Sequence, residues 1–339
     1  HTRCSRDWSS DVCSSDLYSR GQMMRKFSFT TCALIAGLGM LVSGCGQVDM
    51  LKSRLAFKDA NGLYQSQDYR GAIAKYKEAL ELDAATTGPA GAYFFLANSA
   101  DNLYRAARKG EPANDQLLTD AVAGYQKAVK DSADPKIKKL ALEYLVAAYN
   151  NPDKLNDPGQ AEPILLQMIQ MDAKDTANYF ALARIYEDSG NYEQAEQMLI
   201  KARDNDPDEA AVYMQLAGYY NRQGEFEKTI DALQQRAAKE PNNPEAHYTI
   251  ATYYWDKAYR DFRLSEADKK KMVQTGMELV DKALSIKSDY AEAMVYKNLL
   301  LRLQATFEKD AAKQQALLKE ADALRDKAQE MKKKQQAGA

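Results

Sequence analysis

The chain has few of the side chains from which catalytic and metal sites are built. Its 339 residues include four Cys, two His and two Trp. From residue 45 onward, these three types are represented only by Cys45, His247 and Trp255. One His and one Cys cannot supply a Ser–His–Asp triad, a zinc ribbon or a His-ligated metal centre. We therefore expect no enzymatic activity, no cofactor and no bound metal.

An excess of charge of one sign is also missing. Lys and Arg number 46, Asp and Glu number 48, and the net charge is −2. A dedicated nucleic-acid-binding protein needs a basic face, so we expect no nucleic-acid partner. The hydrophobic fraction of 45% is sufficient for a folded core and too high for a disordered chain.

The N-terminal region reads as two segments that precede the folded part. Residues 1–22 show no helix or strand period, and residues 7–17 resemble a translated sequencing-library adapter. We interpret residues 1–22 as an artefact. Residues 23–44 have a basic start and a short apolar run, which is typical of a signal peptide. The run is shorter than the roughly 20 residues that a membrane span needs.

The signal-peptide segment ends in Leu41-Val42-Ser43-Gly44-Cys45, which resembles a bacterial lipobox. The resemblance implies cleavage before Cys45, attachment of lipid to its thiol, and residues 45–52 as a linker to the membrane. An ordinary secretory signal with an incidental Cys is the alternative. Gly46 stands where Asp would favour retention in the inner membrane of enterobacteria. By that resemblance, we expect a lipid-anchored protein at the outer membrane that faces the periplasm.

The rest of the chain is a repeat array. At an offset of 34 residues, like residues align: Tyr179, Tyr213 and His247; Leu182, Leu216 and Ile250; Ala183, Ala217 and Ala251; Tyr186, Tyr220 and Tyr254; Gly190 and Gly224; Pro207 and Pro241. This pattern resembles the tetratricopeptide repeat (TPR). Small residues let two helices approach closely, large residues fill the space between hairpins, and Gly190 suits a turn with positive φ.

The resemblance implies an all-α fold, a right-handed TPR superhelical solenoid of about six helix-turn-helix repeats. Six units exceed the three or so that a stable stack requires. We place the array at residues 53–288, with units at 53–86, 90–134, 136–175, 176–209, 210–243 and 244–288. Insertions near 105–117 and 256–273 interrupt it, and no function is assigned to them. Thr229, Arg236 and Gly276 depart from the consensus.

Residues 289–339 are interpreted as C-terminal capping helices. Apolar residues recur there at spacings of three and four, at Leu317, Ala321, Leu324, Ala328 and Met331. One apolar face predicts a helix that seals the end of the stack, and a coiled-coil partner helix is the alternative.

The family resemblance also implies a binding groove. In TPR proteins the first helices of the hairpins line the concave wall. The residues that correspond here form an aromatic and amide-rich row: Phe57, Asn61, Tyr64, Phe94, Asn98, Phe180, Arg184, Met214, Tyr248 and Trp255. Aromatic side chains are frequent binding hot spots, and amides can pair with an extended backbone. The alternative is that the large residues pack against the neighbouring hairpin and the Asn side chains are solvated.

These features predict a scaffold or adaptor lipoprotein of the cell envelope. Its partner would be a protein, as a peptide segment or helix in the groove. By similarity to known TPR lipoproteins, we expect a role in an outer-membrane or a secretion and pilus assembly complex. A regulatory adaptor of periplasmic cell-wall enzymes is the second hypothesis, and an enzyme with an unrecognised acidic site is the third.

Overall fold

The computed structural model describes the backbone of residues 43–337 and the side chains of residues 46–334. Within that range the chain forms α-helices and one 3-10 turn, and no strand. The expected adapter segment and most of the expected signal peptide lie outside the described residues. No helix within residues 43–337 combines the length and the hydropathy that a membrane crossing would require.

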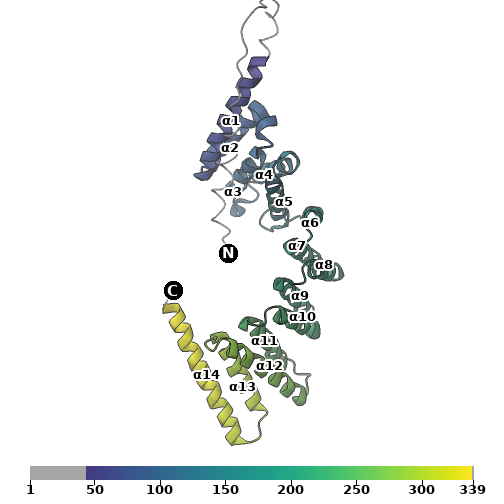
Figure 1. Ribbon diagram of the computed structural model, residues 1–339, viewed down its shortest axis with the longest axis vertical. Coiled ribbons are helices and arrows are strands. Elements are labelled where there is room, and N and C mark those ends of the chain that lie inside the picture. Colours follow the sequence, from purple (N-terminus) through teal and green to yellow (C-terminus); the bar gives the residue numbers. More distant parts are fainter. Residues whose placement is uncertain (1–42, 338–339) are drawn as a thin grey trace, which may run out of the picture. The chain divides into compact units, whose positions relative to one another are not determined.

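The described part of the chain divides between residues 164 and 165 into two compact units, unit 1 before and unit 2 after this point. The helices of unit 1 pack in consecutive antiparallel pairs. They are α1 (Ser43–Gln65), α2 (Tyr69–Thr87), α3 (Ala92–Leu103), the turn η1 (Ala106–Arg108), α4 (Pro112–Asp131) and α5 (Pro135–Asn150) (Figure 1). Residues 45–52, which we expected to be a linker, belong to α1 instead.

Helix α6 (Pro158–Met171) crosses the boundary between the units. Unit 2 then repeats one pattern, in which each helix packs on the next along the chain. Its helices are α7 (Thr176–Asp188), α8 (Tyr192–Asn205), α9 (Ala210–Arg222), α10 (Phe226–Lys239), α11 (Pro244–Arg260), α12 (Glu266–Ile286), α13 (Ala291–Thr306) and α14 (Ala311–Ala337).

Small residues let the helices of a pair approach closely. In α1 and α2, Ala60 and Ala72 are fully buried and lie in one cluster with Tyr76. In the next pair, a Cβ atom on Gly124 would lie 2.8 Å from the Cβ of Ala97. That distance is shorter than a van der Waals contact, so α3 and α4 can pack this closely only because residue 124 is Gly.

Three of the turns within the pairs share one backbone conformation. Gly190 and Gly224 have φ of 76°, in the left-handed region that Gly adopts without strain. The residues that follow them donate backbone hydrogen bonds to Tyr186 and Tyr220, each five positions back. The α1–α2 turn has the same hydrogen bond, but there Gln67 takes φ of 63°.

Three departures from the repeat consensus have local explanations. Gly276 gives room to Leu300 of α13, since a Cβ there would lie 2.9 Å from Leu300 Cδ2. Thr229 is buried, and its hydroxyl donates to the carbonyl of Glu225 at 2.9 Å. The buried guanidinium of Arg236 donates to Glu240 at 3.0 Å and to Glu245 at 3.3 Å. Arg236 therefore connects α10 with the start of α11.

The two insertions have different structures. Residues 105–117 form η1 and the start of α4, and this part is fastened to the loop after α5. Tyr104 donates to the carbonyl of Asp153 at 2.8 Å, and Lys109 donates to that of Pro152 at 3.1 Å. In contrast, residues 256–273 lengthen α11 and α12 and join them through a short loop.

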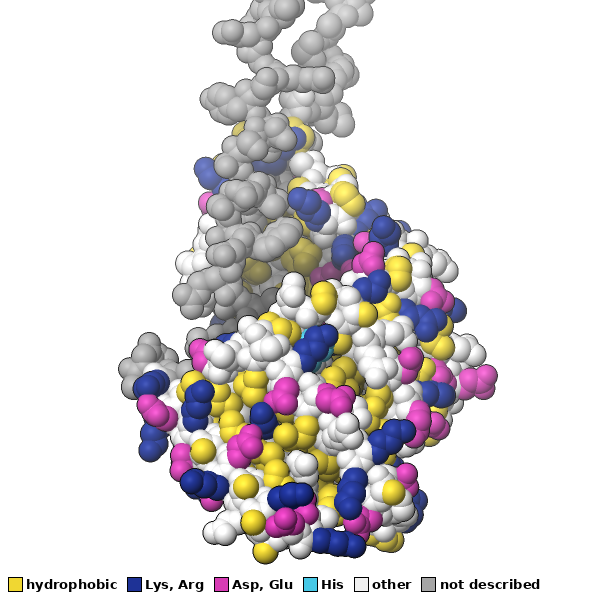
Figure 2. All heavy atoms as spheres, turned by 60° about the horizontal axis from the view of Figure 1, so that its bottom comes forward, with side chains coloured by type: hydrophobic (Ala, Val, Ile, Leu, Met, Phe, Trp, Pro, Cys, Tyr) yellow, Lys and Arg dark blue, Asp and Glu magenta, His cyan; other side chains and the backbone are white. Residues whose placement is uncertain are grey.

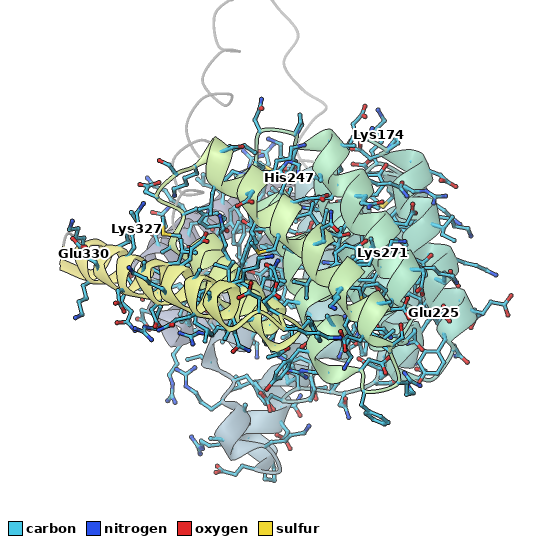
Figure 3. The ribbon with its side chains drawn as sticks, turned by 90° about the horizontal axis from the view of Figure 1, so that it is seen from below. Lys174, Glu225, His247, Lys271, Lys327 and Glu330 are labelled. Atoms are coloured by element: carbon cyan, nitrogen blue, oxygen red, sulfur yellow. The ribbon has the colours of Figure 1, made fainter. Side chains whose placement is uncertain are left out.

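Helix α14 lies along α13 at the end of unit 2 (Figure 3). Its predicted apolar face makes this contact, since Leu324, Ala328 and Met331 pack in one cluster with Ala291 and Met294. Arg302 of α13 also pairs with Asp322 of α14. The packing agrees with the capping interpretation rather than with a free coiled-coil helix.

Candidate functional site

In unit 1, the predicted groove residues are part of an internal network. Phe94 is 5% exposed and Asn98 is 2% exposed, so neither offers a free binding surface. Asn98 accepts a hydrogen bond from the Tyr64 hydroxyl at 2.7 Å. Asn61 accepts one from Tyr76 at 2.7 Å. The expectation that Phe94 and Asn98 line an open groove is corrected, because neighbouring hairpins cover both side chains.

The network continues from Asn98 into the next helices. Its side-chain amide donates to the Tyr125 hydroxyl at 3.2 Å, and Tyr125 donates to Asp101 at 3.4 Å. Lys154, from the loop after α5, pairs with Asp101 at 2.5 Å. Burial raises the pKa of Tyr125 well above its usual value and that of Tyr64 to about 12. These groups therefore stay neutral and serve the fold.

Aromatic rings fill the space around this network. The ring of Phe57 lies 5.9 Å from that of Tyr76, and the ring of Tyr64 lies 5.3 Å from that of Phe95. Phe94 lies 5.7 Å from Tyr125, again between ring centroids. The large first-helix residues of unit 1 thus pack on rings both within a hairpin and between hairpins, as Tyr64 and Phe95 do. This agrees with the packing part of the alternative interpretation, but Asn98 is buried rather than solvated.

In unit 2, the predicted groove residues are all partly or fully exposed, whereas in unit 1 only Phe57, Asn61 and Tyr64 are. Phe180 and Met214 are partly exposed, and Arg184 is exposed and paired with Asp188 at 3.0 Å. The Met214 sulfur lies 2.9 Å from Nη1 of Arg236. Arg222 of α9 reaches Glu187 of α7 with two hydrogen bonds, at 2.6 and 2.8 Å. The first helices of successive hairpins are therefore linked along one face.

Tyr248 and Trp255 belong to a group of five aromatic residues that we call the aromatic surface of unit 2. Its members lie on α11 or at the start and middle of α13: Tyr248, Trp255, Tyr259, Tyr290 and Tyr296. Spacings of seven and four place the three residues of α11 on one side of that helix. All five side chains are partly or largely exposed to solvent.

The rings of the aromatic surface hold one another in place. Tyr248 lies 5.3 Å from Tyr290 and 5.4 Å from Tyr296, both edge to face. Trp255 stacks on Tyr259 at 5.1 Å and meets Tyr296 edge-on at 5.7 Å. Burial, with smaller contributions from the neighbouring Tyr hydroxyls, raises the pKa of Tyr248 to about 12. At neutral pH the surface is therefore uncharged and amphipathic.

Charges of both signs border this region. Figure 2 shows one face of unit 2, with hydrophobic side chains gathered among Lys, Arg, Asp and Glu. Near the aromatic residues, Arg260 pairs with Asp256 at 2.7 Å. Among the side chains that the structure describes, no group of three His, Cys, Asp or Glu residues could hold a metal ion. The arrangement suits contact with another macromolecule better than chemistry on a small one.

His247 shows that the 34-residue offset has a structural counterpart. Its side chain is 4% exposed, and Nε2 lies 3.0 Å from the carbonyl oxygen of Pro241. One repeat earlier, the Tyr213 hydroxyl donates to the carbonyl of Pro207 at 2.8 Å.

A family profile described as tetratricopeptide repeat matches residues 154–219. The chain contains tetratricopeptide repeats.

One solved structure supports this TPR fold. The C-terminal part of a TPR repeat-containing protein from Cytophaga hutchinsonii is 17% identical, with a TM-score of 0.54. The match covers 81% of this chain and 98% of that one, which supports the same fold. YrrB, described as a TPR protein with an unusual peptide-binding site, is 20% identical with a TM-score of 0.39. That match covers 57% of this chain and 89% of YrrB. No curated protein sequence matches the chain.

Sequence reasoning missed three of the five residues of the aromatic surface. Tyr290 and Tyr296 lie beyond residue 288, where we had ended the TPR array, although α13 packs on α11 and α12 like a further first helix. Tyr259 lies in the insertion after Trp255. The spacing of Tyr248, Trp255 and Tyr259 was the available signal, because it places them on one side of a helix.

Proposed function

We propose that this TPR protein is an envelope-anchored scaffold that binds a protein partner on the aromatic surface of unit 2. The TPR fold is a scaffold for protein–protein interaction. The observation that supports this location is the cluster of five ring-packed and accessible aromatic side chains on α11 and α13. In unit 1, by contrast, two of the predicted groove residues, Phe94 and Asn98, are buried by internal packing.

The chemistry of the surface favours a peptide segment or a helix as its occupant. Tyr and Trp supply large contact areas with few rotatable bonds, so little conformational entropy is lost on binding. Mutual ring contacts restrain the rings before a partner arrives, which lowers that loss further. Ion pairs at the border, such as Asp256 with Arg260, can fix the orientation of a charged partner.

The anchor is the second part of the proposal. The sequence before Cys45 resembles a lipobox, and Cys45 falls in the first turn of α1, although its side chain is outside those described. Attached acyl chains would hold α1 at a membrane. Gly46 supports the outer membrane as the destination. We therefore propose a role in an outer-membrane or a secretion and pilus assembly complex.

The test is affinity isolation of partners from detergent-solubilised envelopes. The wild-type protein is compared with Tyr248→Ala/Trp255→Ala and with a control, Tyr192→Ala/Phe262→Ala, which removes two exposed aromatic rings elsewhere in unit 2. We expect a protein that the wild type and the control retain and the first variant loses, with equal helicity by circular dichroism. Equal recovery with all three proteins would reject this surface as the site.

The anchor is tested separately with Cys45→Ser. The wild type should fractionate with membranes and incorporate labelled palmitate, and the variant should do neither. Membrane association and palmitate labelling that persist in the Cys45→Ser variant would refute lipid attachment at this residue.

A further inference from the structure

Helix α1 has a second apolar stripe that plays no part in the fold. Val48, Leu51 and Leu55 are 51%, 60% and 55% exposed, more than any other described Val, Leu or Ile side chain. Spacings of three and four residues place them on one side of the helix. Figure 1 shows this end of α1, in purple, projecting past α2.

The opposite side of α1 already satisfies the packing needs of unit 1. Ser53, Ala56 and Ala60 are buried, and the Ser53 hydroxyl donates to the carbonyl of Ala79 at 2.7 Å. A helix in a two-layer hairpin array needs one apolar face. The exposed stripe therefore requires another explanation, since large aliphatic side chains in a row on a surface mark contact sites.

Cations border the stripe on both sides. Lys52, Arg54 and Lys58 are exposed, and none of them makes a hydrogen bond or ion pair with any other described residue. Many exposed cations of this chain are paired, as Lys270 is with Glu266 at 2.7 Å. Two acids also lie on this part of α1, the partly buried Asp49 and the exposed Asp59, and Asp59 helps to raise the pKa of Lys75 of α2.

We infer that the outer face of α1 lies on an anionic lipid bilayer. Val48, Leu51 and Leu55 enter the boundary between headgroups and acyl chains, and Lys52, Arg54 and Lys58 contact lipid phosphates. An apolar stripe with basic borders is the pattern of helices that lie in the plane of a membrane interface. The unpaired cations favour an anionic surface over an uncharged partner helix. This contact needs neither the lipid on Cys45 nor a partner on unit 2, so it extends the proposed function and can fail independently of it.

The experiment measures binding of residues 46–339 to vesicles. This segment contains every described side chain of both units and lacks the apolar leader and Cys45, so neither can bind the bilayer; its helicity is checked by circular dichroism. Co-sedimentation compares vesicles of phosphatidylcholine with vesicles that also contain phosphatidylglycerol, at low and high salt. The test variant is Val48→Glu/Leu51→Glu/Leu55→Glu. The matched control is Leu166→Glu/Met171→Glu/Ile286→Glu, which replaces three other exposed apolar residues. It changes the net charge of the protein by the same amount as the test variant does.

We expect the wild type and the control to bind phosphatidylglycerol vesicles at low salt, and binding to weaken at high salt. The test variant should bind at least tenfold more weakly, and Lys52→Gln/Arg54→Gln/Lys58→Gln should show a similar loss. The inference would be overturned if the wild type did not bind anionic vesicles, or if the test variant bound them as well as the control. A dimer of the wild type that the test variant abolishes, without vesicle binding, would assign the stripe to a second copy instead.

Discussion

Arg222 of α9 forms a two-pronged contact with Glu187 of α7, with Nε 2.6 Å from Oε1 and Nη2 2.8 Å from Oε2. The Glu187 side chain is 11% exposed and that of Arg222 is 46% exposed. The contact joins the first helices of two successive hairpins, which the chain itself links only through α8. It therefore contributes to the alignment of the face that leads to the aromatic surface.

The hydrogen bond from Arg222 lowers the pKa of Glu187. Because the folded-state pKa lies below the unfolded one, the pair stabilises above about pH 4.3 and loses this contribution as the pH falls through the folded pKa. Solvent reaches Arg222, so we expect about 0.5–1 kcal/mol at neutral pH. Urea unfolding of Glu187→Gln at pH 7 and pH 3 checks this. The variant should be less stable than the wild type at pH 7, and the difference should be smaller at pH 3; an equal difference at both pH values would contradict the assignment.

Asn98 should be among the least replaceable polar residues of unit 1. It contacts Tyr64, Tyr125 and Asn102 through its side chain. Asn98→Leu removes the acceptor of the Tyr64 hydroxyl and one of the two partners of the buried Tyr125 hydroxyl, which keeps Asp101, and we expect a loss of about 1–3 kcal/mol. Asn221→Leu, at an exposed site of unit 2, should change stability by less than about 0.5 kcal/mol. Equal midpoints for the two variants in urea would show that the network contributes little.

The turn at Gln67 offers a stabilising change. Gln67 has φ of 63°, whereas the equivalent positions in unit 2 hold Gly190 and Gly224 at 76°. A side chain in this conformation costs roughly 1 kcal/mol, so Gln67→Gly should stabilise α1 and α2 by about that amount. Gly190→Ala should destabilise unit 2 similarly, although its Cβ would meet no atom within 4 Å. Hydrogen exchange of the flanking helices measures both, and a destabilising Gln67→Gly would contradict the explanation.

The equivalence of His247 and Tyr213 can be tested by exchange. Each donates to the carbonyl of a Pro six residues earlier. Tyr at position 247 can repeat the contact that Tyr213 makes, so we expect His247→Tyr to cost less than about 1.5 kcal/mol. His247→Ala removes the hydrogen bond and leaves a cavity, with an expected loss of about 2–4 kcal/mol. Thermal unfolding compares them, and the reverse order would refute the equivalence.

The sequence predicted the repeated features well, because the 34-residue period indicates both the spacing of the helices and the size of the side chain at each equivalent position. Gly190 lies at a positive φ, as its position in the repeat indicated, and His247 makes the contact that Tyr213 makes one repeat earlier. The accessibility of the candidate site could not be predicted in the same way. Phe94 and Asn98 are buried because rings of other helices, such as Tyr144 at Phe94 and Tyr64 at Asn98, cover them. The repeat period gives the spacing of the helices, but it does not indicate which first-helix side chains a neighbouring ring covers.

The most direct test of the account places a photo-crosslinking amino acid at Thr252. This residue is partly exposed on α11 and falls between Tyr248 and Trp255 on the same side of the helix. The control is the same probe at Gln274, an exposed position of α12. In intact cells we expect the probe at Thr252 to form one covalent adduct with a protein, and the probe at Gln274 to form none. An adduct from Gln274 alone, or no adduct from either position, would contradict the claim that the aromatic surface of unit 2 binds a protein partner.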